Sequence, residues 1–191
     1  MRELSNLPFV LSLPGFRSCS ACRLRGTCSA PVPGAGMALS PLLLVGEAPG
    51  ATEDEQGLPF IGAAGRLLTE LLEAAGCPRS LVYISNVVKC RPPGNRRPFE
   101  DEVAACSGWL LKELEVVGPR VIVALGATAY EFFGGEGVTV NRGSIKMWGE
   151  YAVIPTFHPS YLLRGYNRKF REFVVADLRH AASLAFSRGE I

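Results

Sequence analysis

The sequence predicts a three-layer α/β/α protein, in which a central four-stranded, mostly parallel sheet lies between helices. Two observations predict this fold class. Short, wholly apolar runs are typical of strands that are buried on both faces, and amphipathic stretches with helical spacing alternate with these runs. Such alternation implies right-handed crossovers that cover both faces of a sheet. The 191 residues are 48% hydrophobic and 20% charged, so we expect residues 1–191 to form a single domain.

Four segments are expected to be the strands of this sheet. They are residues 41–46, 81–88, 120–125 and 151–156. The first, PLLLVG, is wholly apolar and ends in glycine, as expected of a short strand that helices cover on both sides.

Helical spacing of apolar side chains predicts four helices between and after these strands. They cover residues 63–75, 99–117, about 127–133, and 170–187. Residues 138–149 are interpreted as a hairpin, because they show no helical period and contain glycines.

The first 37 residues or so are expected to form an irregular arm. They are rich in Pro, Gly, Ser and Cys and show neither helical nor strand periodicity, so something other than a hydrophobic core has to hold them. Prolines break the early apolar stretch, unlike the apolar core of a signal peptide. No run approaches the roughly 20 apolar residues of a membrane span. We therefore expect a cytoplasmic protein that does not bind membranes.

The unusual residues of the chain are concentrated in three loops. These loops, 47–62, 86–98 and 157–164, each follow a predicted strand. In parallel sheets, ligands bind outside the carboxyl ends of the strands. The sequence therefore predicts a functional site where the three loops meet.

The cysteines indicate a metal site. Six cysteines without an export signal argue against disulfides, because cytosolic thiols are kept reduced. Cys19 and Cys22 form a C-x2-C pair, Cys90 follows the second predicted strand, and Cys106 lies in the next predicted helix. Four thiolates could hold either zinc or an iron–sulfur cluster, and Cys28 is a competing ligand. A metal would tie the arm to the rest of the protein.

The net charge of +2 does not by itself indicate a nucleic-acid-binding protein, but the distribution of charge is uneven. Lys89, Arg91, Arg96 and Arg97 follow one another without an intervening acidic residue. Such a run is either a solvated loop or part of a surface for nucleic acid.

Three segments carry a family resemblance. GEAPGATEDEQGLPFIGAAGRLL, YISNVVKCRPPGNRRP and FHPSYLLR, in this order and together with the cysteine spacing, resemble the family-four (iron–sulfur) uracil-DNA glycosylases. The resemblance implies the uracil-DNA glycosylase fold and the removal of uracil from DNA by a DNA-repair enzyme. Independently of the resemblance, we expect the protein to act as a monomer. It also implies a structural 4Fe–4S cluster on Cys19, Cys22, Cys90 and Cys106.

Hydrolysis of a uracil–deoxyribose bond needs stabilisation of a cationic sugar and an anionic base, together with a positioned water. Glu53 is expected to orient that water, and Glu47 to shape the same loop and support the water. His158 can donate a hydrogen bond to uracil O2 as negative charge develops. The amide of Asn86 matches the N3–H and O4 edge of uracil, and Phe60 would stack on the base.

Further residues are expected to bind substrate and DNA. Ala48 and Gly50 lie in the loop that contains both glutamates. Nucleotide flipping calls for an apolar wedge and phosphate contacts. The candidates for these contacts are Leu162 or Leu163 as the wedge, with Ser160, Arg164, Asn95 and Arg96 on the backbone.

Two other functions stay open from the sequence. The chain could be a non-catalytic iron–sulfur protein that binds nucleic acid, or a glycosylase for another deaminated base. The joint presence of Glu47, Glu53, Asn86 and His158 argues against the first of these.

Overall fold

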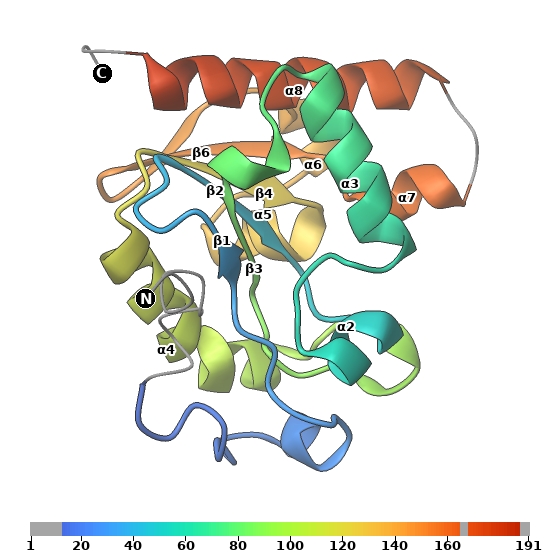
Figure 1. Ribbon diagram of the computed structural model, residues 1–191, viewed down its shortest axis with the longest axis vertical. Helices are drawn as coiled ribbons and strands as arrows, with labels where there is room; N and C mark the ends of the chain where they lie inside the picture. The colour runs from blue at the N-terminus through green and yellow to red at the C-terminus, as the bar shows by residue number, and fades with distance from the viewer. Residues whose placement is uncertain (1–12, 165–167, 188–191) are drawn as a thin grey trace, which may run out of the picture.

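A six-stranded mixed sheet organises the protein in a computed structural model that describes residues 13–164 and 168–187 (Figure 1). The strands are β1 (Ala35–Gly36), β2 (Leu42–Gly46), β3 (Tyr83–Asn86), β4 (Val121–Leu125), β5 (Lys146–Trp148) and β6 (Tyr151–Thr156). Their order is β1-β3-β2-β4-β6-β5, with the middle four parallel and both edge strands antiparallel.

The prediction of a four-stranded sheet was therefore wrong in its number of strands. The four predicted strands are the parallel middle of the sheet, where β2 and β4 are buried throughout. The two missed strands lie at the edges. β1 has only two residues, and β5 is three residues that are half-buried or exposed, so neither has the apolar run by which a buried strand is recognised.

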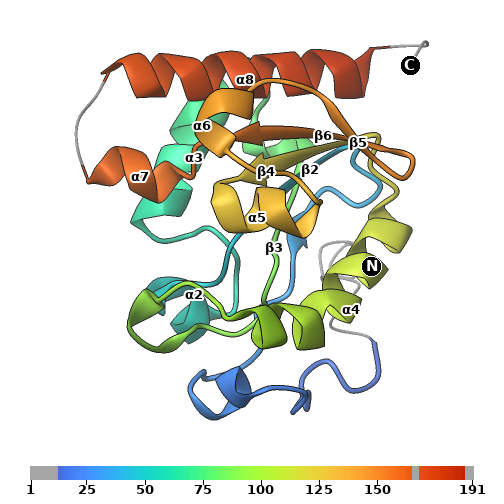
Figure 2. The same cartoon turned by 180° about the vertical axis from the view of Figure 1, so that it is seen from behind.

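Helices cover both faces of the sheet. Their bounds are α2 (Ala51–Gln56), α3 (Ala63–Ala74), α4 (Glu100–Val117), α5 (Ala127–Phe132), α6 (Val138–Asn141), α7 (Pro159–Leu163) and α8 (Arg168–Phe186), with 3-10 turns η1 (Arg23–Gly26), η2 (Arg79–Leu81) and η3 (Pro93–Asn95). Helices α3 and α8 lie on one face, and α4 and α5 on the other (Figures 1 and 2). None of the described helices is long and apolar enough to cross a membrane.

The four predicted helices are present, but the predicted hairpin over residues 138–149 is wrong. Its first part is helix α6, and its last part is β5, which pairs with β6 rather than with residues before it. The short helices α2, of six residues, and α7, of five, lie in segments that the sequence analysis left as loops, because their side chains show no clear helical period.

The described part of the arm is better packed than its composition suggests. Phe16, Leu24 and Val32 are completely buried, and Phe16 meets the ring of Trp109 on α4 edge to face at 5.1 Å. Buried apolar side chains therefore contribute to holding residues 13–37, which the composition did not indicate.

Candidate active site

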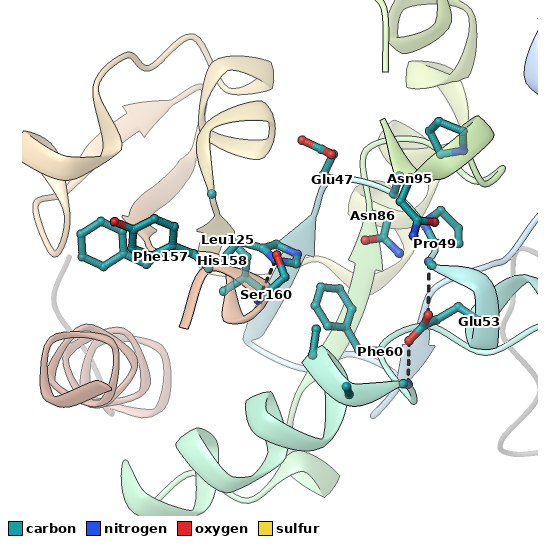
Figure 3. A pocket seen from close by; sticks show the side chains of 18 of the residues that line it. Glu47, Pro49, Glu53, Phe60, Asn86, Asn95, Leu125, Phe157, His158 and Ser160 are labelled. Atoms are coloured by element: carbon teal, nitrogen blue, oxygen red, sulfur yellow. Dashed lines mark hydrogen bonds between the residues drawn. The ribbon is translucent and has the colours of Figure 1, made fainter. Parts of the chain in front are cut away.

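The loops at the carboxyl edge of the parallel strands surround a cavity of about 630 Å³ (Figure 3). The loops after β2 and β3 are bonded to each other, because the amides of Val87 and Val88 donate to the carbonyls of Gly46 and Glu47 at 2.9 and 3.1 Å. Most of the sequence-predicted site residues line the cavity: Glu47, Ala48, Gly50, Glu53, Phe60, Asn86, Asn95, Arg96, His158, Ser160 and Arg164. The structure thus brings together residues from the three predicted loops.

Asn86, the last residue of β3, offers an unused hydrogen-bonding group to this cavity. Its side chain is 2% exposed, and its Oδ1 has no hydrogen-bond partner in the described part of the chain. A buried polar atom without a partner is unfavourable by roughly 1–3 kcal/mol. The arrangement therefore suits a ligand that supplies a complementary polar edge.

Phe60 forms an apolar wall beside Asn86, and its backbone takes an unusual conformation to do so. Its φ is 52°, a left-handed value that bulky residues rarely adopt. Two glycines leave room for it. A Cβ on Gly65 would lie 1.9 Å from the Phe60 carbonyl oxygen, and one on Gly46 would lie 2.4 Å from the Phe60 ring and 2.6 Å from Asn86 Oδ1.

Glu53 is a buried carboxylate rather than an exposed loop acid. It is 8% exposed and accepts three backbone N–H bonds, from Gly50 at 3.2 Å, Ile61 at 2.9 Å and Gly62 at 2.7 Å. It therefore joins the start of α2 to the segment that carries Phe60. Most of its accepting capacity is directed at the protein backbone.

Glu47 has fewer internal partners. Its carboxylate accepts a hydrogen bond from the hydroxyl of Thr128 on α5, and it is only partly buried. In Figure 3 the side chains of Glu47, Asn86, Phe60 and His158 surround one central space. The carboxylate oxygens of Glu47 can thus accept further hydrogen bonds within the cavity.

His158 is held as a neutral hydrogen-bond donor. It caps the N-terminus of α7, where its Nδ1 accepts the backbone N–H of Ser160 at 3.1 Å. Because Nδ1 accepts, a neutral ring carries its proton on Nε2. Burial and then the nearby charge of Arg164 lower the pKa of His158 to about 4, against a smaller opposing effect of Glu53. The ring lies 5.7 Å from that of Phe60.

The two predicted wedge leucines differ in exposure. Leu162 is partly buried and packs against the core, whereas Leu163 is 51% exposed. Neither leucine lines the cavity, but Tyr161 beside them does, and it stacks on Phe157 with 5.7 Å between ring centres.

The basic run of residues 89–97 is largely engaged within the protein. Lys89 is buried, Arg96 makes a two-pronged contact with Glu102 at 2.6 and 2.8 Å, and Arg97 pairs with Glu131. Neither sequence interpretation of this run therefore holds for Lys89, which is neither solvated nor available to nucleic acid.

A second, smaller hollow is lined by the four cysteines of the predicted ligand set, Cys19, Cys22, Cys90 and Cys106. All six cysteines are free thiols. Two N–H groups point at sulfur: the indole of Trp109 donates to Cys19 at 3.4 Å, and the amide of Lys89 donates to Cys106 at 3.2 Å. Such donors stabilise thiolates, which are the ligand form of cysteine.

These cysteines form a donor set that suits a metal centre with all-thiolate ligation. Burial raises the pKa of Cys106 to about 11 and that of Cys90 further, so the thiolates need compensating positive charge from a cofactor. Within residues 13–164 and 168–187, no three metal-binding side chains stand as close as one ion requires. Cys28 does not line the hollow, but its thiol lies against Cys90.

Sequence reasoning missed several residues of the cavity. Leu125, at the end of β4, and Val138 and Thr139, on α6, all line it. Leu125 could have been found, because the rule that placed ligands at strand ends applies equally to the third predicted strand. Nothing in the sequence pointed to the two α6 residues as part of a site, because their segment was interpreted as a hairpin away from the three predicted loops.

Comparison with known proteins identifies the family. Residues 33–180 match the model of the uracil DNA glycosylase superfamily, and the chain belongs to that superfamily. It is 48% identical over 177 residues to the Type-4 uracil-DNA glycosylase of Thermotoga maritima, which covers 91% of this chain and 92% of that protein.

Two further relatives have the same name. The Type-4 uracil-DNA glycosylase of Sulfurisphaera tokodaii is 42% identical over 181 residues, 89% of this chain and 81% of that protein. That of Archaeoglobus fulgidus is 42% identical over 177 residues, 87% and 88% of the two chains. The resemblance to family four inferred from three motifs is thereby confirmed.

Proposed function

We propose that this protein is a uracil-DNA glycosylase, which hydrolyses the N-glycosidic bond of deoxyuridine in DNA, releases uracil and leaves an abasic site. The observation that carries the proposal is the amide oxygen of Asn86, which has no partner among the described residues and is buried in a cavity beside Phe60 and a neutral His158. The names of the relatives support the same activity.

Base recognition uses the amide and the aromatic ring. Asn86 Oδ1 accepts from uracil N3–H, and its amide N–H donates to O4. Cytosine presents the reverse pattern at these two positions, so it would leave the buried amide mismatched. Phe60 stacks on the flipped base.

Leaving-group stabilisation belongs to His158. Its Nε2–H donates to uracil O2 as the electrons of the C1′–N1 bond move onto the base. A neutral imidazole suits this role, because its proton remains on the ring throughout the reaction.

We assign to Glu47 the water-orienting role that was expected of Glu53. Three backbone amides already engage the carboxylate of Glu53, so its proposed role is to hold the segment that carries Phe60. Glu47 accepts a proton from the water whose oxygen bonds to C1′, and its charge stabilises the cationic sugar in the transition state. Uracil leaves as an anion and takes its proton from solvent.

Access to the base requires the nucleotide to leave the duplex. Leu163 is the proposed wedge, because it is the more exposed of the two leucines. Ser160 and Arg164 lie on the same turn and contact phosphates, with Asn95 and Arg96 across the cavity. Ala48 and Gly50 provide a floor without side chains that would block the base.

A 4Fe–4S cluster on Cys19, Cys22, Cys90 and Cys106 is proposed as a structural cofactor. When bound, it supplies four metal–thiolate links that join the arm, the loop after β3 and helix α4. We further propose a monomer that acts on uracil-containing DNA in the cytoplasm, where six free thiols stay reduced.

The test is incubation of purified, iron-loaded protein with a uracil-containing oligonucleotide, followed by alkali. We expect strand cleavage at uracil and none at cytosine or thymine in matched oligonucleotides. Intact uracil strands would overturn the activity. Binding without cleavage would favour the non-catalytic alternative, and cleavage only at hypoxanthine would favour a different base.

A further inference from the structure

The least expected group in the protein is a buried lysine between the two sites. Lys89 is 1% exposed, and the side chain of its partner Glu113 on α4 is equally inaccessible. Burying two charges is unfavourable unless each is fully hydrogen-bonded. Such a pair needs a reason beyond stability, because apolar residues of the same size would serve stability as well.

Every donor of the lysine ammonium group is used. Its Nζ donates to Ser85 Oγ at 2.6 Å, to Glu113 Oε2 at 2.6 Å and to the backbone carbonyl of Asn86 at 3.0 Å. Ser85 and Asn86 are the last two residues of β3. The positive charge thus lies against the backbone carbonyl of Asn86, the residue proposed to recognise uracil.

The backbone of the same lysine reaches the other site. Its amide donates to Cys106 Sγ at 3.2 Å, and its carbonyl accepts the amide of Val32 in the arm at 2.6 Å. Glu113 extends this link, because its Oε1 accepts the amide of Gly34 at 2.7 Å. Cys90, a predicted ligand, is the next residue in the chain.

We propose that Lys89 is a positioning residue, which fixes the Asn86 peptide for uracil recognition and couples it to the cysteine centre. The inference rests on the proposed function and deepens it. The side-chain oxygen of Asn86 has no partner within the described residues, so its direction depends on the backbone that carries it. Lys89 holds that backbone on one side, while the bond from Val87 to Gly46 holds it on the other.

The test uses a pair variant, Lys89→Met/Glu113→Gln, which removes both charges and leaves no unpaired buried ion. Its matched control is Arg142→Met/Asp177→Asn, which neutralises another ion pair with a buried carboxylate between residue 142 and α8. Single-turnover excision is measured for both, in the wild-type background and in Asn86→Ala. Iron content and melting temperature are measured alongside.

We expect the pair variant to excise uracil about tenfold more slowly than wild type and to show no further loss in the Asn86→Ala background. The control should keep the wild-type rate. An undiminished rate, an equal loss in the Asn86→Ala background, or an equal loss in the control would each overturn the proposal. If the pair variant does not fold, Ser85→Ala takes its place with the same criteria and a smaller loss, of about threefold.

A second measurement separates this inference from the activity itself. The side-chain amide signals of Asn86 in a ¹⁵N NMR spectrum are assigned by their disappearance in Asn86→Ala. They should broaden or split in the pair variant and stay unchanged in the control, whether or not the protein excises uracil. Unchanged signals in the pair variant would refute the coupling, whereas absent excision by wild type would refute only the proposed function.

Discussion

The cavity and the cysteine centre are built in opposite ways. The cavity is formed by short loops at the ends of neighbouring strands, and local backbone hydrogen bonds hold its side chains, as the three amides around Glu53 show. The cysteine centre joins an irregular arm, a loop and a helix that are distant in sequence. Its buried thiols favour the protonated form. The cavity is therefore preorganised largely by short-range backbone hydrogen bonds, while the proposed cluster would complete the cysteine centre.

Glu47→Gln is expected to cause the largest loss of activity in the cavity without changing the cysteine centre. We expect single-turnover excision to fall by about 10²–10³-fold, because the water loses its base and the cationic sugar loses a charge. Binding to uracil-containing DNA and the iron content should be unchanged.

Glu55→Gln, on the exposed side of α2, is the matched control and should keep the wild-type rate. If Glu47→Gln were nearly as fast as wild type while Glu53→Gln lost its activity with its melting temperature intact, the two carboxylates would have to exchange roles.

The reverse experiment removes one cysteine of the cysteine centre and measures how much the rate of uracil excision falls. In Cys90→Ser we expect loss of bound iron, rapid proteolysis within residues 13–37, and about tenfold slower excision through the Lys89 link. Cys77→Ser, at a buried cysteine that does not line the hollow, should retain iron. Full iron binding by Cys90→Ser would remove Cys90 from the ligand set.

A smaller effect is expected at the DNA-facing turn. Leu163→Ala should slow excision from double-stranded DNA by about three- to tenfold and leave single-stranded DNA almost unaffected, because only a duplex needs a wedge. Leu162→Ala should instead lower the melting temperature, since Leu162 packs against the core. A duplex-specific defect in Leu162→Ala alone would assign the wedge to that residue.

The smallest effect on activity concerns pH. With the pKa of His158 lowered to about 4, titration of its ring should not alter excision between about pH 6 and 9. It should alter stability. The unfolded chain binds a proton on this ring below about pH 6.5 and the folded protein does not until about pH 4, so stability falls as pH drops through this range, by at most about 3 kcal/mol.

Urea unfolding of wild type and His158→Gln between pH 4 and 7 measures this contribution. The difference in unfolding free energy between the two proteins should depend on pH within this window and be constant above it. A difference that stayed constant throughout would show that the ring is protonated normally in the folded protein.

Sequence analysis predicted the elements with a regular apolar pattern and missed those of only a few residues. The parallel strands have wholly apolar runs, and the long helices α3, α4 and α8 have an apolar period. The rule that ligands bind at strand ends brought Glu47, Asn86 and His158 to one cavity. The edge strands and α6 were missed because two to four residues show no period. The burial of Lys89 could not be predicted either. It depends on Glu113, which is distant in sequence and occupies the buried face of α4, where a glutamate is not expected.

Gly46 also makes the cavity easy to close. One methyl group at this position would lie 2.4 Å from the Phe60 ring and 2.6 Å from Asn86 Oδ1, so Gly46→Ala would displace these two side chains and obstruct the place proposed for the base. Both glutamates and all six cysteines would remain in place. Such a variant would separate occupancy of the base cavity from every other contact with DNA, which makes it a tool for capturing the enzyme on DNA before the base has entered.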